Sequence, residues 1–175
     1  MTEQSSDYVL YKHKRYNLID CESNLIKTAD FGMKETNCHS TACYRGYTAE
    51  YSIEDNILYG TKSVDYHVSE DSFDTYIVES KKMRMHFTGA ILIAFTDTED
   101  FNDDFLETFL DAEEAYELYF VDGILKKEIS LESVIKGWDR LVNDNSRIYR
   151  KLNCEKFLKR HLKHRYCDYK WKTRG

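Results

Sequence analysis

The sequence contains no proline, and nowhere in its 175 residues is there an apolar run of the roughly 18 positions that a membrane span needs. Its first residues lack the apolar core of a secretion signal, so we expect a cytoplasmic protein without membrane contact. The absence of proline argues against a proline-rich linker. Five cysteines are an odd number, which fits reduced thiols better than a disulfide framework. The length predicts one main domain, with room for an appendage.

Sequence motifs of common enzymes are missing as well. The chain has no phosphate-binding loop, no dinucleotide-binding glycine pattern, no zinc-protease motif and no nucleophile elbow. Neither of two groups of Cys and His has the paired, closely spaced ligands of a zinc site, so we predict no metal and no cofactor. We assign no catalytic residue and favour a binding protein over an enzyme. The two groups are Cys38, His39 and Cys43, and His161, His164 and Cys167.

The charges are divided unevenly along the chain. Residues 1–135 carry 12 Lys and Arg against 27 Asp and Glu, which gives a net charge of −15. Residues 136–175 carry 13 Lys and Arg against 4 Asp and Glu, which gives a net charge of +9. Together they give the net charge of −6. Because like charges crowded together repel each other, this division predicts an oppositely charged partner for at least one part. Either the basic end docks on the acidic body, or one of the two binds another molecule.

Alternation of apolar and polar residues predicts a series of β-strands before residue 130. The strongest pattern is a hairpin around Asp122-Gly123, because both turn residues tolerate a positive φ. A Lys-His-Lys turn and a Glu-Asp-Asn turn predict two further hairpins. The expected strands cover residues 8–11, 15–19, 44–53, 57–66, 88–95, 115–121 and 124–129.

Helical spacing occurs in three segments. Segment 97–117 has phenylalanines at every fourth position, ten carboxylates and no Lys or Arg. A second helix is predicted after Ser130 as its N-cap, and a third over residues 148–166. We therefore predict an α+β fold, mainly an antiparallel β-sheet with a packed acidic amphipathic helix and a C-terminal helical appendage. Residues 1–130 would form the acidic body, and residues 131–175 a basic helical extension docked on it.

One strand carries a resemblance to a known family. Residues 41–47 read Thr-Ala-Cys-Tyr-Arg-Gly-Tyr, and Phe-Thr-Gly and Leu-Tyr-Phe follow at 87–89 and 118–120. With these segments the chain resembles a family of uncharacterised bacterial proteins that carry a Thr-Ala-Cys-Trp-Arg-Gly-Tyr strand, although Tyr44 stands where that family has Trp. The resemblance covers roughly residues 8–130 and implies a bacterial, cytosolic, β-rich body. It implies no activity and transfers no catalytic residue.

Two interpretations of this strand remain. In the first, Cys43 is a nucleophile and Arg45 holds an anion, with His39 as the nearest base in the sequence. In the second, Cys43 is a small core residue and Arg45 pairs with one of the many acids. We prefer the second interpretation because free cysteines are usually simply buried. Tyr44, Arg45 and Tyr47 are kept as a candidate binding or structural strand.

The acidic segment predicts a surface for a basic protein partner. Carboxylates facing outward from a helix would attract a cationic protein and speed its association. A small acidic protein without catalytic motifs is similar, as a class, to bacterial immunity proteins, so our leading hypothesis is neutralisation of a basic toxin by direct binding. The predicted contact residues are Asp100, Asp103, Asp104, Glu107, Asp111 and Glu114.

The basic C-terminus supports an alternative, nucleic-acid binding or processing. Lys and Arg mixed with aromatic residues suit a surface where phosphates take the charge and bases stack on rings. The acidic body would repel a polyanion, and nucleic-acid-binding domains are usually basic overall, so this alternative stands second. Its predicted face consists of Lys159, Arg160, Lys163, Arg165 and Trp171.

Overall fold

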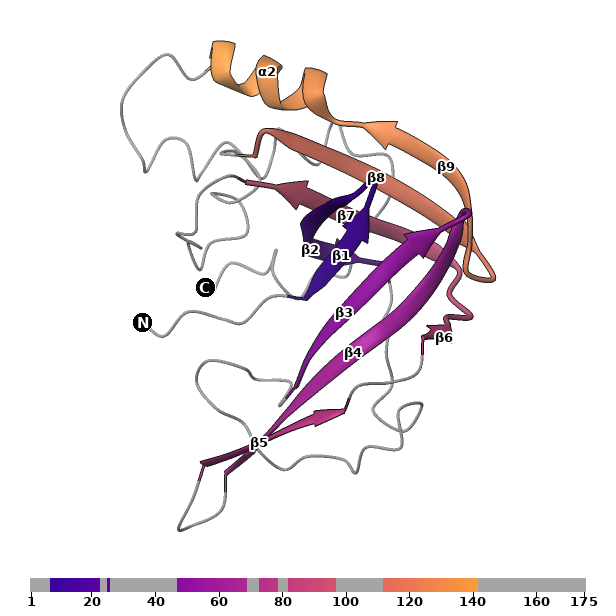
Figure 1. Cartoon of the computed structure of the whole chain (residues 1–175). Coiled ribbons are helices and arrows are strands. Elements are labelled where there is room, and N and C mark those ends of the chain that lie inside the picture. Colours follow the sequence, from indigo (N-terminus) through magenta and orange to yellow (C-terminus); the bar gives the residue numbers. More distant parts are fainter. Residues whose placement is uncertain are drawn as a thin grey trace.

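Strands dominate the structure, a computed structural model that describes residues 7–22, 25, 47–68, 73–78, 82–96 and 112–141 (Figure 1). Within these segments there is a single, short helix. In chain order the elements are β1 (Tyr8–Tyr11), β2 (Lys14–Cys21), β3 (Tyr47–Glu54), β4 (Ile57–Val68), β5 (Phe73–Val78), β6 (Met83–Arg84), β7 (Gly89–Phe95), β8 (Glu114–Val121), β9 (Ile124–Ser130) and α2 (Glu132–Leu141).

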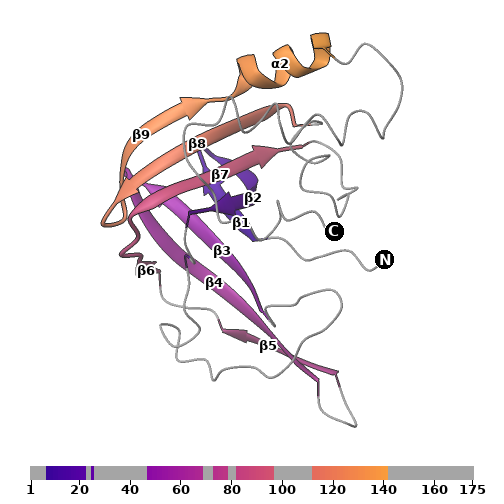
Figure 2. The ribbon, with the colours of Figure 1, turned by 180° about the vertical axis from the view of Figure 1, so that it is seen from behind.

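Seven of these strands close into a barrel. The order around the ring is β3-β1-β2-β7-β8-β9-β4, and β4 pairs again with β3. β1 and β3 run parallel, whereas the other pairings among the described strands are antiparallel. β5 and β6 lie outside the ring and pair with β4. In Figure 1 and Figure 2, β7 to β9 form one arm, β3 and β4 form the other, and the β1–β2 hairpin lies between them.

Three tight turns connect neighbouring strands of the ring. The turn residues Lys12-His13, Asp55-Asn56 and Asp122-Gly123 all have a positive φ, between 49° and 72°. Two consecutive residues of this conformation match the right-handed twist of the flanking strands. The three hairpins predicted from the sequence are therefore confirmed, and the strands expected near 88–95, 115–121 and 124–129 are confirmed as β7, β8 and β9.

The barrel closes between β4 and β9 through few backbone contacts. In the described residues these two strands pair at one position, Ile57 with Ile124. Next to it, Leu58 N donates a hydrogen bond to Gly123 O at 2.8 Å. Gly123 N in turn donates to Phe87 O at 2.7 Å, so the Asp-Gly turn and the segment before β7 hold the seam together.

Apolar side chains of every ring strand fill the barrel. Their burial follows from strand alternation, since every second side chain points inward. At about 1.5–3 kcal/mol for each large apolar side chain, this burial is the main stabilising contribution. The buried interior side chains include Val9, Tyr16, Tyr51, Leu58, Ile91, Ile93, Leu118 and Phe120.

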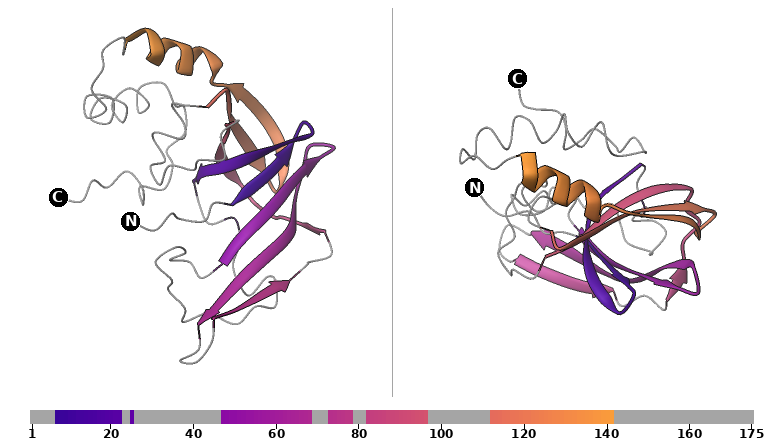
Figure 3. Two further views of the ribbon diagram at one scale, coloured as in Figure 1. Left: turned by 60° about the vertical axis from the view of Figure 1, so that its left-hand side comes forward. Right: turned by 90° about the horizontal axis from the view of Figure 1, so that it is seen from above.

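The outer face of β7 and β8 is covered by α2 (Figure 3). Leu131, Ile135 and Trp138 are buried there, against alanines and Leu92 of the sheet. The small alanine side chains let the helix approach closely. The predicted helix after residue 130 is confirmed, and Ser130 Oγ accepts a weak hydrogen bond from Glu132 N at 3.4 Å. No helix in the described part of the chain is long and apolar enough to span a membrane.

The predicted α+β fold class is wrong. The sheet does not lie open with an acidic helix packed on it and helices appended, but closes on itself as a barrel, with α2 as the one helix among the described residues. Glu114, at the end of the expected acidic helix, lies in β8, and residues 115–117 are strand, as predicted. Residues 97–111 of that segment and the expected helix over 148–166 lie outside the described residues.

Candidate functional site

Few of the residues predicted from the sequence lie in the described part of the chain. Of the six acidic contact residues, Glu114 is described, at the start of β8. Tyr47 opens β3, whereas Tyr44 and Arg45 fall outside. Also outside are Asp100, Asp103, Asp104, Glu107 and Asp111, the basic set Lys159, Arg160, Lys163, Arg165 and Trp171, and the Cys and His groups at 38–43 and 161–167.

Glu114 belongs to a group of polar and aromatic side chains at the tip of the β1–β2 hairpin, which we call the hairpin-tip cluster. Strand pairing assembles it, because β2 lies beside β7, β7 beside β8 and β8 beside β9. Phe95 is paired with Glu114, for example, and Leu118 with Glu128. The cluster consists of Tyr11, Lys12, Lys14, Tyr16, Phe95, Glu114, Tyr116 and Glu128.

Glu128 of β9 is held by two neighbours on β1 and the turn. The hydroxyl of Tyr11 donates a short hydrogen bond to its Oε2. Lys12 Nζ lies 2.6 Å from its Oε1. Tyr11 is almost completely buried, whereas the Lys12 side chain is 49% exposed. One oxygen of the carboxylate is therefore fixed from the interior, and the other meets a cation at the surface.

Glu114 has the same arrangement. The hydroxyl of Tyr16, a fully buried side chain, donates to Glu114 Oε2 at 2.8 Å. Lys14 forms an ion pair with Oε1 and is 45% exposed. Again a buried tyrosine holds one carboxylate oxygen and an exposed lysine holds the other.

Aromatic rings surround both ammonium groups. Lys12 Nζ lies 5.1 Å from the ring centre of Tyr11 and 4.8 Å from that of Tyr116, and Lys14 Nζ lies 4.8 Å from that of Phe95. The rings also touch one another, since Tyr116 lies 6.0 Å from Tyr11 in an edge-to-face arrangement. Ring faces attract cations, so the cluster combines the two kinds of group that proteins use to bind ammonium ions.

The protonation states of the cluster suit binding better than proton transfer. Burial and the hydrogen bond to Glu128 raise the pKa of Tyr11, and burial and Glu114 do the same for Tyr16. Lys14 and Tyr16 lower the pKa of Glu114. Burial opposes ionisation of Glu128, but its hydrogen bonds from Lys12 and Tyr11 outweigh that effect and lower its pKa. All four values move away from neutral pH, where a general acid or base works best.

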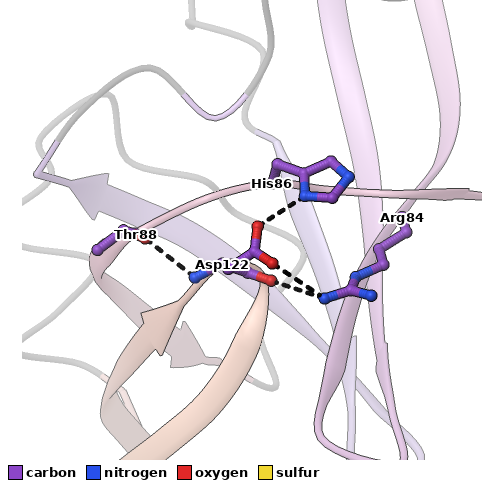
Figure 4. A network of polar contacts seen from close by, with 4 residues as sticks. All are labelled: Arg84, His86, Thr88 and Asp122. Atoms are coloured by element: carbon purple, nitrogen blue, oxygen red, sulfur yellow. Dashed lines mark hydrogen bonds and ion pairs between the residues drawn. The ribbon is translucent and has the colours of Figure 1, made fainter.

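A second polar group surrounds Asp122 in the Asp-Gly turn (Figure 4). His86 Nδ1 lies 2.6 Å from Asp122 Oδ1, and Arg84 Nη2 lies 3.3 Å from Oδ2. Asp122 N donates to Thr88 Oγ1 at 2.9 Å. The bond from His86 lowers the pKa of Asp122. The side chains of Arg84, His86 and Asp122 are all strongly exposed, and their contacts fasten the turn to the segment before β7 rather than shape a cavity.

Neither group has the composition of a metal site. In the segments that the structure describes, no three His, Cys, Asp or Glu side chains lie close enough together to hold a metal ion.

The chain matches no protein-family model, no curated protein and no solved structure. The resemblance of residues 41–47 to a bacterial family therefore stays a resemblance, and function has to be argued from the site itself. The excess of tyrosine and acid in the first 135 residues indicated the kind of surface that the cluster forms. Of its members, however, the sequence pattern singled out Glu114 and not Tyr11, Lys12, Lys14, Tyr16, Phe95, Tyr116 or Glu128.

Proposed function

We propose that this protein is a binding module for a basic protein partner, which contacts the hairpin-tip cluster. One observation carries the proposal: two ionised carboxylates and four aromatic rings lie together at one end of the barrel and already hold two ammonium groups. A surface that binds lysines of its own chain has the chemistry to bind cations of another chain.

Composition supports the same proposal. The charge of −15 on residues 1–135 would draw a cationic protein towards the barrel over the Debye length of about 8 Å at physiological salt. Tyrosine is enriched in protein interfaces, and this chain has 14. The specific role that we propose is that of an immunity-type protein, which neutralises a basic bacterial toxin in the cytoplasm by direct binding.

The test is capture of a basic protein from the cells that make this chain. Immobilised wild-type protein should retain a basic protein at low salt and release it at high salt. The double variant Glu114→Gln, Glu128→Gln should retain much less. The matched control is Glu54→Gln with Glu132→Gln, because these two exposed carboxylates also form ion pairs with lysines, elsewhere on the molecule.

The outcomes separate the proposal from its alternatives. If the control variant loses the partner as fully as the cluster variant, the binding reflects net charge and the site is wrong. If no basic protein is retained and nucleic acid is retained instead, the proposal fails. Loss of that nucleic acid on neutralising Lys159, Arg160 and Lys163 would then favour the alternative function. For toxin neutralisation, co-expression of this chain should restore the growth of cells that the captured protein alone inhibits.

A further inference from the structure

We propose that Lys12 and Lys14 are internal occupants of two cation subsites, and that lysine side chains of the basic partner replace them on binding. The inference rests on the proposed function and specifies its site. One subsite is formed by Tyr11, Tyr116 and Glu128 around the Lys12 ammonium, and the other by Phe95 and Glu114 around that of Lys14.

The two oxygens of each carboxylate have different partners. Glu114 and Glu128 each have one oxygen bonded to a buried tyrosine hydroxyl, which fixes the position of the acceptor. The second oxygen of each meets a lysine whose side chain is about half exposed. A fixed acceptor with an exposed, singly bonded cation can exchange that cation without any change in the barrel.

Releasing the two lysines from their carboxylates costs little free energy. Exposed ion pairs contribute little to stability, because water solvates both ions well when they separate. The side chains of Tyr11 and Tyr16 are buried in the barrel core, so both tyrosines should stay in place. The lysines can therefore leave while the rings and carboxylates remain as a formed site.

The geometry also selects the incoming group. An arginine binds a carboxylate best through two parallel hydrogen bonds, one to each oxygen. At both Glu114 and Glu128 the Oε2 atom already accepts from a tyrosine, and Tyr116 also hydrogen-bonds Glu114, so the two parallel donors of an arginine would have to share each carboxylate with these hydroxyls. A lysine ammonium is a compact point donor and fits beside these hydroxyls, as Lys12 and Lys14 themselves show. The partner is thus expected to present neighbouring lysines.

Self-occupation lowers the apparent affinity for an external cation, because only the fraction of molecules with an empty subsite can bind it. Removing the internal lysines should therefore tighten binding. A purely structural role of the two lysines predicts no such gain. This difference provides the test.

The experiment titrates a hexalysine peptide into wild-type protein and into the Lys12→Met, Lys14→Met variant by calorimetry. The variant is expected to bind hexalysine roughly tenfold more tightly. The matched control is Lys82→Met with Lys136→Met, which changes the net charge equally and also frees two carboxylates from exposed ion pairs. Equal tightening in the control, or no tightening in the cluster variant, would overturn the inference.

A second measurement uses the wild-type protein and does not depend on how the variant folds. The ε-methylene protons of Lys12 lie near two tyrosine rings, so their NMR signals should be shifted upfield by the ring currents. Hexalysine should move them back towards ordinary lysine values. Those of Lys82, which lies over the ring of Tyr59 away from the cluster, should stay in place. Lys12 signals that do not move at saturating hexalysine would contradict replacement.

Failure of this inference can be told apart from failure of the proposed function. If a basic partner is captured equally well by wild type and by the Glu114→Gln, Glu128→Gln variant, the partner binds elsewhere and the replacement of lysines is wrong. If hexalysine behaves as expected and no basic protein is captured, the subsites stand and the proposed function falls.

Discussion

At the scale of single residues, Glu114 and Glu128 connect the stability of the protein to pH. Both have a pKa below the ordinary 4.5 in the folded state. As the pH falls, the unfolded chain therefore binds protons before the folded protein does. The stabilisation that these carboxylates contribute is fully present above about pH 4.5 and is lost as the pH falls through their folded values.

We therefore expect the unfolding free energy of the wild type to decrease on acidification more steeply than that of the Glu114→Gln, Glu128→Gln variant. Urea unfolding followed by circular dichroism from neutral to acid pH measures the difference. The Glu54→Gln, Glu132→Gln variant serves as the control, since it keeps the hairpin-tip cluster intact. If the unfolding free energies of the wild type and the Glu114→Gln, Glu128→Gln variant fall in parallel with pH, neither carboxylate has a stabilising environment.

Only part of this site could be predicted from sequence. Glu114 was identified, but as one of many acids on a helix, whereas it lies on a strand. Its actual partners, Lys14 and Tyr16, are 100 and 98 residues away along the chain. No local pattern reports contacts across such distances. The sequence could therefore indicate an acidic, aromatic surface without indicating which acid meets which ring.

At the scale of elements, the Asp-Gly turn is the most sharply constrained. Gly123 has φ of +72°, and a Cβ atom there would collide with the carbonyl oxygen of Met85. The backbone cannot shift easily, because Gly123 O accepts a hydrogen bond from Leu58 across the seam of the barrel and Gly123 N donates to Phe87 O in the segment before β7. The Gly123→Ala variant should lose more than about 2 kcal/mol of stability.

Chemical denaturation measures this loss, and Asn56→Gly provides the comparison. Asn56 also has a positive φ, 64°, so glycine suits that conformation and the change should stay within about 1 kcal/mol. An alanine variant as stable as the wild type would mean that the Asp-Gly turn does not hold the seam.

The orientation of Glu128 shows why element prediction was incomplete. Leu125 is paired with Phe120, whose side chain faces the barrel interior. If side chains alternated strictly from Leu125 onward, Lys127 and Ile129 would face the interior and Glu128 the outside. A register shift opposite Tyr119 and Phe120 instead pairs Glu128 with the buried Leu118. A single extra residue exchanges the two faces of a strand. The hairpin was predictable from its turn, but the bulge that places the exposed Glu128 on the same face of the sheet as Leu118 was not.

At the scale of the whole molecule, the barrel depends on pairings that turn chemistry does not specify. The three tight hairpins follow from local sequence. Closure needs the parallel pairing of β1 with β3 and the contact of β4 with β9 at Ile57 and Ile124, between strands that are far apart in the sequence. An antiparallel sheet with the same hairpins could equally stay open, which is why the sequence led to the wrong fold class.

The distribution of charge over the whole chain leads to the last prediction, which separates attraction from binding. Charges outside a contact mainly govern the rate of association, whereas hydrogen-bonded charges within it govern dissociation. Neutralising Asp100, Asp103, Asp104 and Glu107, which lie outside the described residues, should slow association with the basic partner and flatten its dependence on salt, because carboxylates steer a cationic protein. The Glu114→Gln, Glu128→Gln variant should instead dissociate faster.

Surface plasmon resonance at several salt concentrations measures the association and dissociation rates. The control is a variant in which Lys159, Arg160 and Lys163 are neutralised, which should slow neither the association nor the dissociation of a basic protein. If the cluster variant changes only the association rate, Glu114 and Glu128 act at a distance like the other acids. The contact would then have to lie on another face of the molecule, because a carboxylate that is hydrogen-bonded within an interface cannot be removed without shortening the lifetime of the complex.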